Sequence, residues 1–471
     1  MDNKEFRAQA HKLVDWMADY LDTIEDRPVK PTVTPKSIYN QIENSPPNTG
    51  EQMDDIFRDF KDIILPGMTT WQHPNFHAYF PGNSSYPSVL AEMLTATMGA
   101  QCMMWDTSPA AAELEEQVME WLHDMLGLPN GWVGCIQDTA STATLSAILS
   151  AREKLTNYKI NQQGFSGDEN MRVYCSSQTH SSIDKAVKIS GIGSENLIKV
   201  EVDQSMAMDP VALDLAMKKD KKDNFLPVCV IANLGTTGTT AIDPIDAIAD
   251  VCKKHDVWLH VDAAYAGTAL VLEEYRWMIE GLEKADSFVF NPHKWMFTNF
   301  DCSAYFVKDK RALLNTFEIT PEYLKTTFDK EVNNYRDWGI PLGRRFRALK
   351  LWFVIRSYGV DGIKSRIKEH ILMARTMGEK IDAHPEFEQL APLNFNMICF
   401  RYHPKSISDP DQLNQINEEL LRALNNSEKV YLTHTKVDNI YTIRMVIGQT
   451  YVQQKHVDKA WNLILELIKT I

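Results

Sequence analysis

Apolar side chains recur at every third or fourth position along the first part of the chain. They are Phe6, Ala10, Leu13, Met17, Tyr20 and Ile24. This spacing predicts an amphipathic helix with one apolar face. Because a large apolar face is normally covered by another surface, we expect this helix to pack on the rest of the chain or on a partner. Pro28, Pro31 and Pro35 then predict an extended connector.

From about residue 85, short apolar runs alternate with stretches of helical periodicity. The clearest strand candidates are residues 173–176, 226–233, 258–262 and 287–291. Strands that are apolar throughout indicate a mostly parallel central sheet covered by helices on both faces. Each run ends in polar or small residues, and ligands of such sheets bind beyond the carboxyl ends of the strands. We therefore expect the reactive side chains at that edge.

The pattern changes after about residue 345, where helical periodicity dominates. Residues 349–381 are predicted to be helical, residues 397–402 and 441–447 to be strands, and a final helix to begin near His456. These elements predict a small C-terminal α+β domain. The predicted division is an N-terminal helical segment, a large α/β domain and this small domain, at residues 1–84, 85–345 and 346–471.

Composition narrows the range of partners. The chain has 471 residues and a net charge of −14, which argues against nucleic acid and anionic membranes because phosphate groups select basic surfaces. No apolar stretch reaches the length of about 18 residues that a membrane span needs. The seven cysteines include no CxxC pair, and the N-terminus is too acidic for a signal peptide. We expect a cytoplasmic protein without a metal site.

A lysine follows the last predicted strand of the large domain. Residues 287–295 read SFVFNPHKW, so Lys294 comes directly after an apolar run. Desolvation at such a position lowers the pKa of a lysine and makes its amine nucleophilic towards an aldehyde. On this segment alone, a lysine whose amine reaches solvent is the commoner explanation.

An aspartate ends the preceding strand, in the run LHVDAAY at residues 259–265. Asp262 can pair with a buried cation such as a protonated pyridine nitrogen. A flat ring could lie against the small Ala263 and Ala264. The alternative is an aspartate that caps the next helix.

Two further segments could bind an aromatic, phosphorylated ligand. Residues 138–144, with the sequence DTASTAT, open a helical run, and a helix start with hydroxyl groups suits a phosphate. His180 is aromatic and could stack on a ring. The commoner explanations are an ordinary helix cap and a structural or exposed histidine.

The order of these features along the chain is that of fold-type I enzymes that use pyridoxal 5′-phosphate (PLP). The sequence resembles the group II PLP decarboxylases that act on aromatic amino acids, and the resemblance runs nearly end to end. The most specific matching segments are HVDAAYAG at residues 260–267 and NPHKW at residues 291–295. Further matches are WQHP, FHAYFP, SPA, TAS, THSS and PLGRRF, at residues 71–74, 76–81, 108–110, 139–141, 179–182 and 341–346. The fold implied is α/β, like that of aspartate aminotransferase.

The resemblance implies a role for each cofactor-binding residue. Lys294 would form the Schiff base with PLP, and Asp262 would pair with its pyridine nitrogen. His180 would stack on one face of the ring and Ala264 on the other. The residues that hold the phosphate or lie beside the cofactor would be Thr139, Ala140, Ser141, Thr237, Asn291 and His293.

The resemblance also implies a substrate pocket. Its residues would be Trp71, Tyr79, Phe80, Pro81, Met103 and Gly343. Met103 stands where animal members have Phe, and Met is the more adaptable side chain. Plant members that select tyrosine tend to carry Ser where this chain has Gly343, and glycine leaves room for a larger ring. Tyr323 lies where the family keeps a mobile catalytic loop and would protonate the substrate carbon.

The implied function is PLP-dependent decarboxylation of an aromatic L-amino acid (tyrosine, DOPA, tryptophan or phenylalanine) by a homodimer, with the N-terminal segment packing on the partner subunit. The products would be an aromatic amine and CO₂. Members with Phe at the Tyr323 position or Asn at the His180 position form aldehydes, so this chain favours the amine.

Other functions remain open. They are an aromatic aldehyde synthase, a transaminase and a catalytically inactive PLP-fold binding protein. A dinucleotide-binding oxidoreductase is poorly matched, because the glycine-containing run at residues 191–196 lacks the third glycine and follows no predicted strand.

Overall fold

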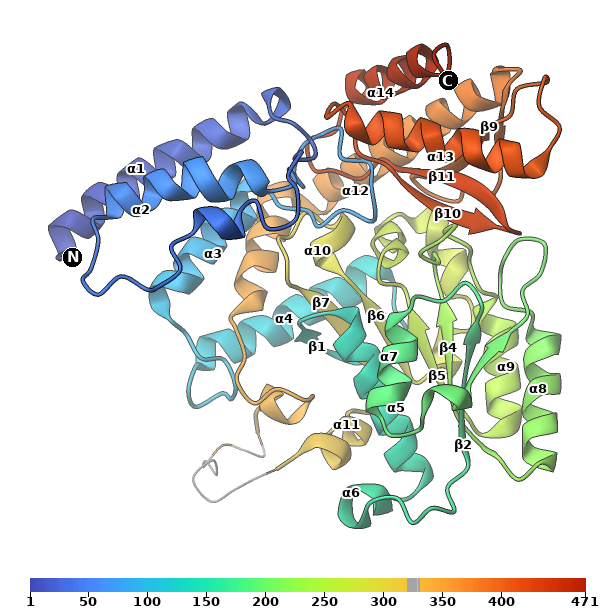
Figure 1. Ribbon diagram of the computed structural model, residues 1–471. Helices are drawn as coiled ribbons and strands as arrows, with labels where there is room; N and C mark the ends of the chain where they lie inside the picture. The colour runs from blue at the N-terminus through green and yellow to red at the C-terminus, as the bar shows by residue number, and fades with distance from the viewer. Residues whose placement is uncertain (320–327, 329–330) are drawn as a thin grey trace. The chain divides into compact units, whose positions relative to one another are not determined.

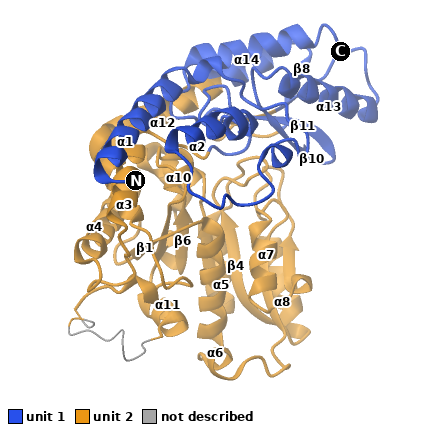
Figure 2. Cartoon of the chain, turned by 60° about the vertical axis from the view of Figure 1, so that its left-hand side comes forward, with its two compact units in different colours: residues 1–81, 376–390, 400–471 blue, residues 82–375, 391–399 orange. Residues whose placement is uncertain are grey.

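The computed structural model describes residues 1–319, 328 and 331–471. Two compact units make up the described chain, and each combines separate stretches of sequence (Figure 2). Unit 1 comprises residues 1–81, 376–390 and 400–471, and unit 2 comprises residues 82–375 and 391–399. In the part of the chain that the structure describes, no helix has the length and apolar character needed to cross a membrane.

Unit 2 is built on a seven-stranded sheet with strand order β1-β7-β6-β5-β4-β2-β3 (Figure 1). The strands are β1 (Val133–Gln137), β2 (Met171–Ser176), β3 (Leu197–Val200), β4 (Leu226–Asn233), β5 (Trp258–Asp262), β6 (Ser287–Phe290) and β7 (Ser303–Val307). Strands β3, β2, β4, β5 and β6 are parallel, whereas β7 is antiparallel to both β6 and β1. Every residue of β5 and β6 is buried, as expected for strands covered on both faces. The predicted mostly parallel α/β fold is confirmed.

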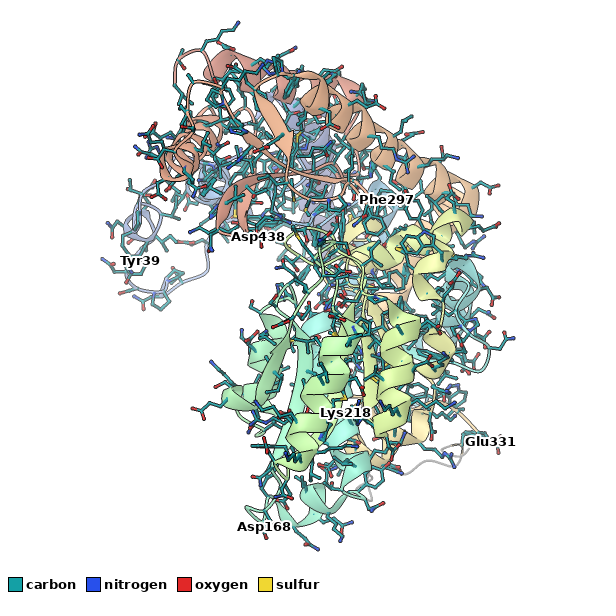
Figure 3. All side chains as sticks on the ribbon, turned by 90° about the vertical axis from the view of Figure 1, so that its right-hand side faces the viewer. Tyr39, Asp168, Lys218, Phe297, Glu331 and Asp438 are labelled. Carbon is teal, nitrogen blue, oxygen red and sulfur yellow. The ribbon has the colours of Figure 1, made fainter. Side chains whose placement is uncertain are left out.

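The helices of unit 2 are α3 (Tyr86–Met98), α4 (Pro109–Leu126), α5 (Ala140–Leu155), α6 (Lys159–Gln163), α7 (Ser182–Ile189), α8 (Pro210–Lys222), α9 (Ile245–His255), α10 (Pro292–Trp295), α11 (Lys310–Phe317) and the first part of α12 (Arg347–Ala383). Of these, α4, α5, α8, α9 and α10 contact strands of the sheet. Ile148 of α5 and Val187 of α7 share one apolar core with Cys229 of β4. The outer surface of α8 carries charged side chains such as Lys218, which forms an ion pair of 2.7 Å with Asp214 (Figure 3). Helix α12 is kinked at Gly359, where φ is 65°.

Unit 1 combines the N-terminal helices with a four-stranded sheet of order β10-β11-β9-β8. Its elements are α1 (Asn3–Asp22), α2 (Met53–Asp59), β8 (Phe387–Gln389), the end of β9 (Met397–Tyr402), α13 (Pro410–Asn426), β10 (Thr433–Val437), β11 (Ile440–Val446) and α14 (Gln454–Leu467). Asp2 caps α1 by accepting a hydrogen bond from the N–H of Glu5, at 2.7 Å. Helix α1 buries none of its residues, and Phe6 on its apolar face remains 56% exposed.

Candidate active site

The carboxyl ends of β4, β5 and β6 lie side by side and carry the predicted reactive residues. Asn233 at the end of β4 is in register with Asp262 at the end of β5. The N–H of Ala263 donates to the carbonyl oxygen of Val289 at 2.9 Å, and the N–H of Asn291 donates to that of Ala264 at 3.0 Å. These bonds hold the segment after β5 against the segment that leads into α10. Asp262 and Lys294 are therefore brought to the same edge of the sheet.

Burial acts on Asp262 and Lys294 in opposite directions. It raises the pKa of Asp262. Weaker effects lower that pKa, among them a hydrogen bond from the N–H of Ala264 to Oδ1 at 3.0 Å and the charge of Lys294. Burial lowers the pKa of Lys294, and the charge of Asp262 opposes this. The lysine therefore has a larger share of the neutral, nucleophilic amine than an exposed lysine has. The carboxylate, in turn, would be stabilised by a further cation beside it.

His180 follows β2 and lies just before α7. Its Nδ1 accepts a hydrogen bond from the N–H of Ser182 at 3.1 Å and lies 2.8 Å from Oγ of the same residue. Because a backbone N–H can only donate, Nδ1 carries no proton, and the neutral ring carries its proton on Nε2. The pKa of His180 is lowered by partial burial and then by the charge of Lys294, while Asp262 raises it. The imidazole therefore lies within electrostatic range of both residues.

A buried hydrogen-bond network lies behind His180. Nδ2 of Asn233 donates to Oγ1 of Thr179 at 2.9 Å, and the N–H of Asn233 donates to Oδ2 of Asp243 at 2.7 Å. Oδ1 of Asp243 also accepts from the N–H of Met208 at 2.7 Å. Burial raises the pKa of Asp243 to about 6. The network ties the turn that carries His180 to the strand end beside Asp262, and the sequence analysis missed it.

The start of α5 and the loop before α10 supply hydrogen-bond donors. Ala140 and Ser141 are the first two residues of α5, where backbone N–H groups have no partner inside the helix. Thr139 is the N-cap, and its Oγ1 accepts from the N–H of Thr142 at 3.4 Å. Oγ of Ser303 lies 2.7 Å from Oδ1 of Asn291 and 3.3 Å from the carbonyl oxygen of Asp138. Ser303 thus links Asn291 to the segment that begins α5.

Asn291 and His293 are both oriented as donors. The bond from Ser303 occupies Oδ1 of Asn291, which leaves Nδ2 available to donate. Nδ1 of His293 accepts from the N–H of Cys302 at 2.9 Å, so the proton of its neutral ring is on Nε2. Burial lowers the pKa of His293 to about 3, which keeps the ring neutral. Asn83, which the sequence analysis also missed, holds the backbone of α10 by donating to the carbonyl oxygen of Lys294 at 2.6 Å.

This donor set fits pyridoxal 5′-phosphate. Backbone N–H groups at a helix start, the amide of Asn291 and Nε2 of His293 suit a phosphate. Asp262 suits a protonated ring nitrogen, and Lys294 suits an aldehyde. Ala264 and Thr237 are partly buried, the latter in the loop that follows β4.

The predicted substrate residues fall into two groups, one in each unit. In unit 1 the rings of Trp71 and Tyr79 stack with centroids 6.0 Å apart, and Arg444 lies over the ring of Phe80 at 5.7 Å. Pro81 is buried and is the last residue of this stretch of unit 1. Trp71 and Tyr79 are 41% and 47% exposed, so they offer aromatic surface to a ligand.

In unit 2, Met103 and Gly343 lie on two segments joined by hydrogen bonds. The N–H of Arg336 donates to the carbonyl oxygen of Met103 at 2.8 Å, and the N–H of Cys102 donates to that of Arg344 at 2.9 Å. Tyr323, the predicted proton donor, lies outside the described residues.

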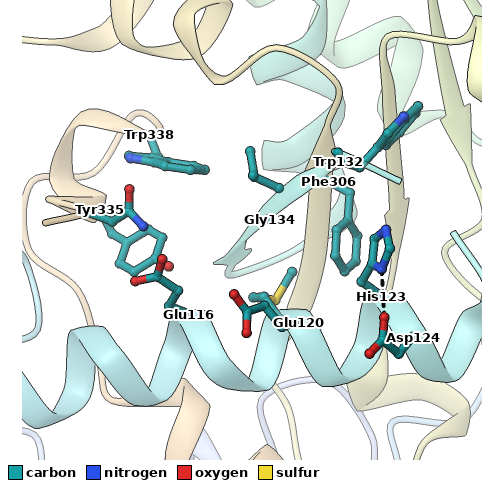
Figure 4. A pocket seen from close by; sticks show the side chains of 13 residues that line it. Glu116, Glu120, His123, Asp124, Trp132, Gly134, Phe306, Tyr335 and Trp338 are labelled. Carbon is teal, nitrogen blue, oxygen red and sulfur yellow. Dashed lines mark hydrogen bonds and ion pairs between the residues drawn. The ribbon is translucent and has the colours of Figure 1, made fainter. Parts of the chain in front are cut away.

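A separate pocket of about 280 Å³ lies along β1, an outer strand of the same sheet (Figure 4). Glu116 and Glu120 point into it from α4, below Trp338. Its lining includes Val133 at the start of β1 and Trp338, whose carbonyl oxygen accepts from Nε2 of Gln137 at the end of β1, at 3.2 Å. The pocket contains none of the predicted site residues.

Known proteins with similar sequences also indicate a site for pyridoxal 5′-phosphate. Residues 35–403 match the family model described as the pyridoxal-dependent decarboxylase conserved domain. The chain is 41% identical to phenylacetaldehyde synthase of Arabidopsis thaliana, over 99% of this chain and 96% of the relative. It is 39% identical to tyrosine decarboxylase 4 of Petroselinum crispum, over 98% of this chain and 93% of the relative.

A solved structure is similar over its whole length. The crystal structure of Oryza sativa TDC with PLP and tryptamine has a TM-score of 0.96 and 33% identity, and the match covers 99% of this chain and 98% of that one. The family match, the relatives and the site described above agree on the cofactor. The chain therefore belongs to the pyridoxal-dependent decarboxylases, enzymes that use pyridoxal 5′-phosphate to remove the carboxyl group of an amino acid.

Proposed function

We propose that this enzyme decarboxylates aromatic L-amino acids to aromatic amines and CO₂. The observation that carries the proposal is the grouping of Asp262, Lys294 and His180 at one sheet edge, where Asp262 and Lys294 affect each other's pKa and both affect that of His180. The aromatic substrate class is supported by the names of the relatives and by the exposed rings of Trp71 and Tyr79.

Each residue has a distinct task in this proposal. When bound, PLP supplies a ring that accepts the electron pair left behind by the departing CO₂. Asp262 keeps the ring nitrogen protonated, and Lys294 provides the amine that holds the cofactor. His180 covers one face of the ring with its Nε2–H available as a donor, and Ala264 covers the other. Donors at the start of α5, together with Asn291 and His293, hold the phosphate.

The fate of the substrate carbon separates two candidate reactions. After CO₂ leaves, that carbon must take a proton to give an amine, and we assign this transfer to Tyr323. By the resemblance described above, Tyr at this position and His at position 180 favour the amine. Aldehyde synthesis is the second candidate, because a relative with 41% identity is named phenylacetaldehyde synthase.

The proposed enzyme is a cytoplasmic homodimer whose N-terminal segment, residues 1–84, packs on the partner. Phe6 on α1 is 56% exposed, and α3, which follows the N-terminal segment, carries a group of exposed apolar side chains, Leu90, Met93, Leu94 and Met98. A large continuous apolar surface is normally covered by another surface. Phe6→Glu with Leu90→Glu should give a monomer in sedimentation velocity. Leu215→Glu, a change on α8 at a side chain that is 59% exposed, should leave the dimer intact.

The decisive experiment combines the absorbance spectrum with product analysis. The purified enzyme with PLP should show a visible band that is absent from Lys294→Ala, and it should release CO₂ and an amine from at least one aromatic L-amino acid. Aldehyde and peroxide in place of amine would select the second candidate. A cofactor band without any product from aromatic substrates would refute the proposed substrate class.

A further inference from the structure

Gln101 is held rigidly beside Gly343 in unit 2. Its Oε1 accepts a hydrogen bond from the N–H of Arg344 at 2.7 Å. Its carbonyl oxygen accepts bonds from the hydroxyl groups of Thr107 and Ser108, at 3.1 and 3.0 Å. Because a backbone N–H can only donate, the atom that accepts from Arg344 is the oxygen, and the carboxamide has one orientation.

Arg344, whose N–H holds the carboxamide of Gln101, is itself well anchored. The guanidinium of Arg344 pairs with the buried Glu115 at 2.6 and 3.0 Å and also donates to the carbonyl oxygen of Ile136 at 2.7 Å. Arg344 is only 8% exposed. The backbone N–H that fixes the carboxamide of Gln101 therefore belongs to a residue that is locked into the core of unit 2.

The other end of the carboxamide lies over Gly343. A Cβ atom placed on Gly343 would lie 3.1 Å from Nε2 of Gln101, so the amide nitrogen occupies the space beside the missing side chain. Both residues are exposed, and no described residue accepts a hydrogen bond from Nε2. An oriented N–H donor is thus presented beside Gly343, which the family resemblance assigns to the substrate pocket.

We propose that Gln101 is a specificity-determining residue whose Nε2 donates a hydrogen bond to the ring hydroxyl of a phenolic substrate, tyrosine or DOPA. The inference rests on the proposed function and on the family resemblance, which assigns Gly343 to the substrate pocket. A phenolic oxygen accepts a hydrogen bond, whereas the indole N–H of tryptophan only donates and a phenyl ring offers no polar atom. Tryptophan and phenylalanine would leave the donor unpaired once the substrate excludes water.

Selectivity should follow from this difference. An unpaired, desolvated donor lowers the relative kcat/KM by about 10- to 100-fold. We therefore expect the wild-type enzyme to favour tyrosine over phenylalanine and tryptophan by about that factor. Glycine at position 343 leaves this arrangement undisturbed, because a Cβ there would lie 3.1 Å from Nε2 and displace the carboxamide by a few tenths of an ångström.

Gln101→Met is the sharpest test, since it removes the donor at similar side-chain length, whereas the carboxylate of Gln101→Glu could still accept a hydrogen bond from the phenolic O–H. Gln101→Met should lower kcat/KM for tyrosine about tenfold or more and leave that for phenylalanine within about twofold. Gln117→Met makes the same chemical change on the exposed face of α4 and should leave the ratio unaltered.

Two failures can be told apart. An unchanged tyrosine-to-phenylalanine ratio in active Gln101→Met would overturn the role of Gln101 and leave the proposed function standing, as would a wild-type preference for tryptophan. A wild-type enzyme that binds PLP but releases neither amine nor aldehyde from these amino acids would overturn the proposed function and the inference together.

Discussion

Two edges of the seven-stranded sheet both carry ionisable and aromatic side chains, but they treat the charges differently. At the carboxyl edge, Asp262 is buried, and its charge and that of Lys294 shift each other's pKa. At the edge formed by the outer strand β1, Glu116 and Glu120 point from α4 into a pocket but are exposed to solvent (Figure 4). Water screens exposed charges and leaves buried ones to act strongly on a ligand. A buried charge beside a group of opposite charge therefore identifies the reactive edge better than the residue types present do.

Burying these charges costs stability, which the carboxyl edge offsets with hydrogen bonds. Asp262 accepts from a backbone N–H, and Asp243 accepts from two. An unpaired buried carboxylate would be strongly destabilising. The network of Asn233, Thr179 and Asp243 is thus part of what allows the reactive residues to remain buried.

The largest effect is expected from Asp262→Asn at the end of β5. The neutral amide cannot supply the charge that keeps a ring nitrogen protonated, so kcat should fall by about 100- to 1000-fold. Asp286→Asn is the matched control. Asp286 directly precedes β6, and its carboxylate accepts from the N–H of Leu259, near the start of β5, at 2.9 Å. Steady-state kinetics should show the control within about threefold of wild type. Equal losses in both variants would contradict the distinction between the two edges.

The next effect concerns Asp243→Asn. An amide has one acceptor oxygen, so its NH₂ group would face the N–H of either Met208 or Asn233. The free energy of unfolding should fall by about 1–3 kcal/mol, and kcat should fall because the turn carrying His180 loses its anchor. Urea unfolding measures the first quantity and steady-state kinetics measure the second, while the circular dichroism of the bound cofactor reports whether its surroundings have changed. Loss of stability with an unaltered cofactor signal would limit Asp243 to a structural role.

These two aspartates also show how far sequence reasoning reaches. Asp262 ends a run that is apolar except for His260, and the run predicts both β5 and the position of the carboxylate at the strand end. Asp243 has no such signal, because its bonds to Asn233 and Met208 depend on how a loop folds back. Sequence patterns predict local burial well, but they do not predict the contacts that form when a loop folds back.

The same limit explains the strands that were missed. Strand β1 contains Gly134, which lowers its resemblance to a strand. In the fold, a Cβ on Gly134 would lie 2.3 Å from Cε of Met119 and 2.8 Å from the ring of Phe306, so close packing of α4 and β7 requires glycine. Packing of this kind comes from residues far apart in sequence. The parallel strands were predicted because their own composition was sufficient.

Acid should weaken unit 2, because it contains histidines buried in neutral form. Burial lowers the pKa of His260 and of His370 from 6.5 to about 3. Below pH 6.5 the unfolded chain binds more protons than the folded chain, so the stability that these rings contribute is present above about pH 6.5 and is lost as the pH falls towards 3.

Unfolding in urea at pH 7 and pH 5 measures this loss. Each buried histidine should contribute about 1–2 kcal/mol to the difference between the two free energies of unfolding. His260→Gln should reduce the difference by that amount, whereas His11→Gln, on the exposed surface of α1, should not change it. A difference that His260→Gln leaves unaltered would show that other groups control the acid response.

The smallest effect is expected at the edge formed by β1, where an unexpected result would contradict the comparison most directly. Glu116→Gln with Glu120→Gln removes two exposed charges from the pocket of Figure 4 and should change the free energy of unfolding by no more than about 0.5 kcal/mol. The kcat should be unaltered, because no described hydrogen bond or ion pair joins these carboxylates to Asp262, Lys294 or His180. The pocket also includes Tyr335 and Trp338, which follow Tyr323 in the chain. A clear fall in kcat would therefore mean that the pocket affects catalysis through this segment, and exposure to water would no longer separate the inert edge from the reactive one.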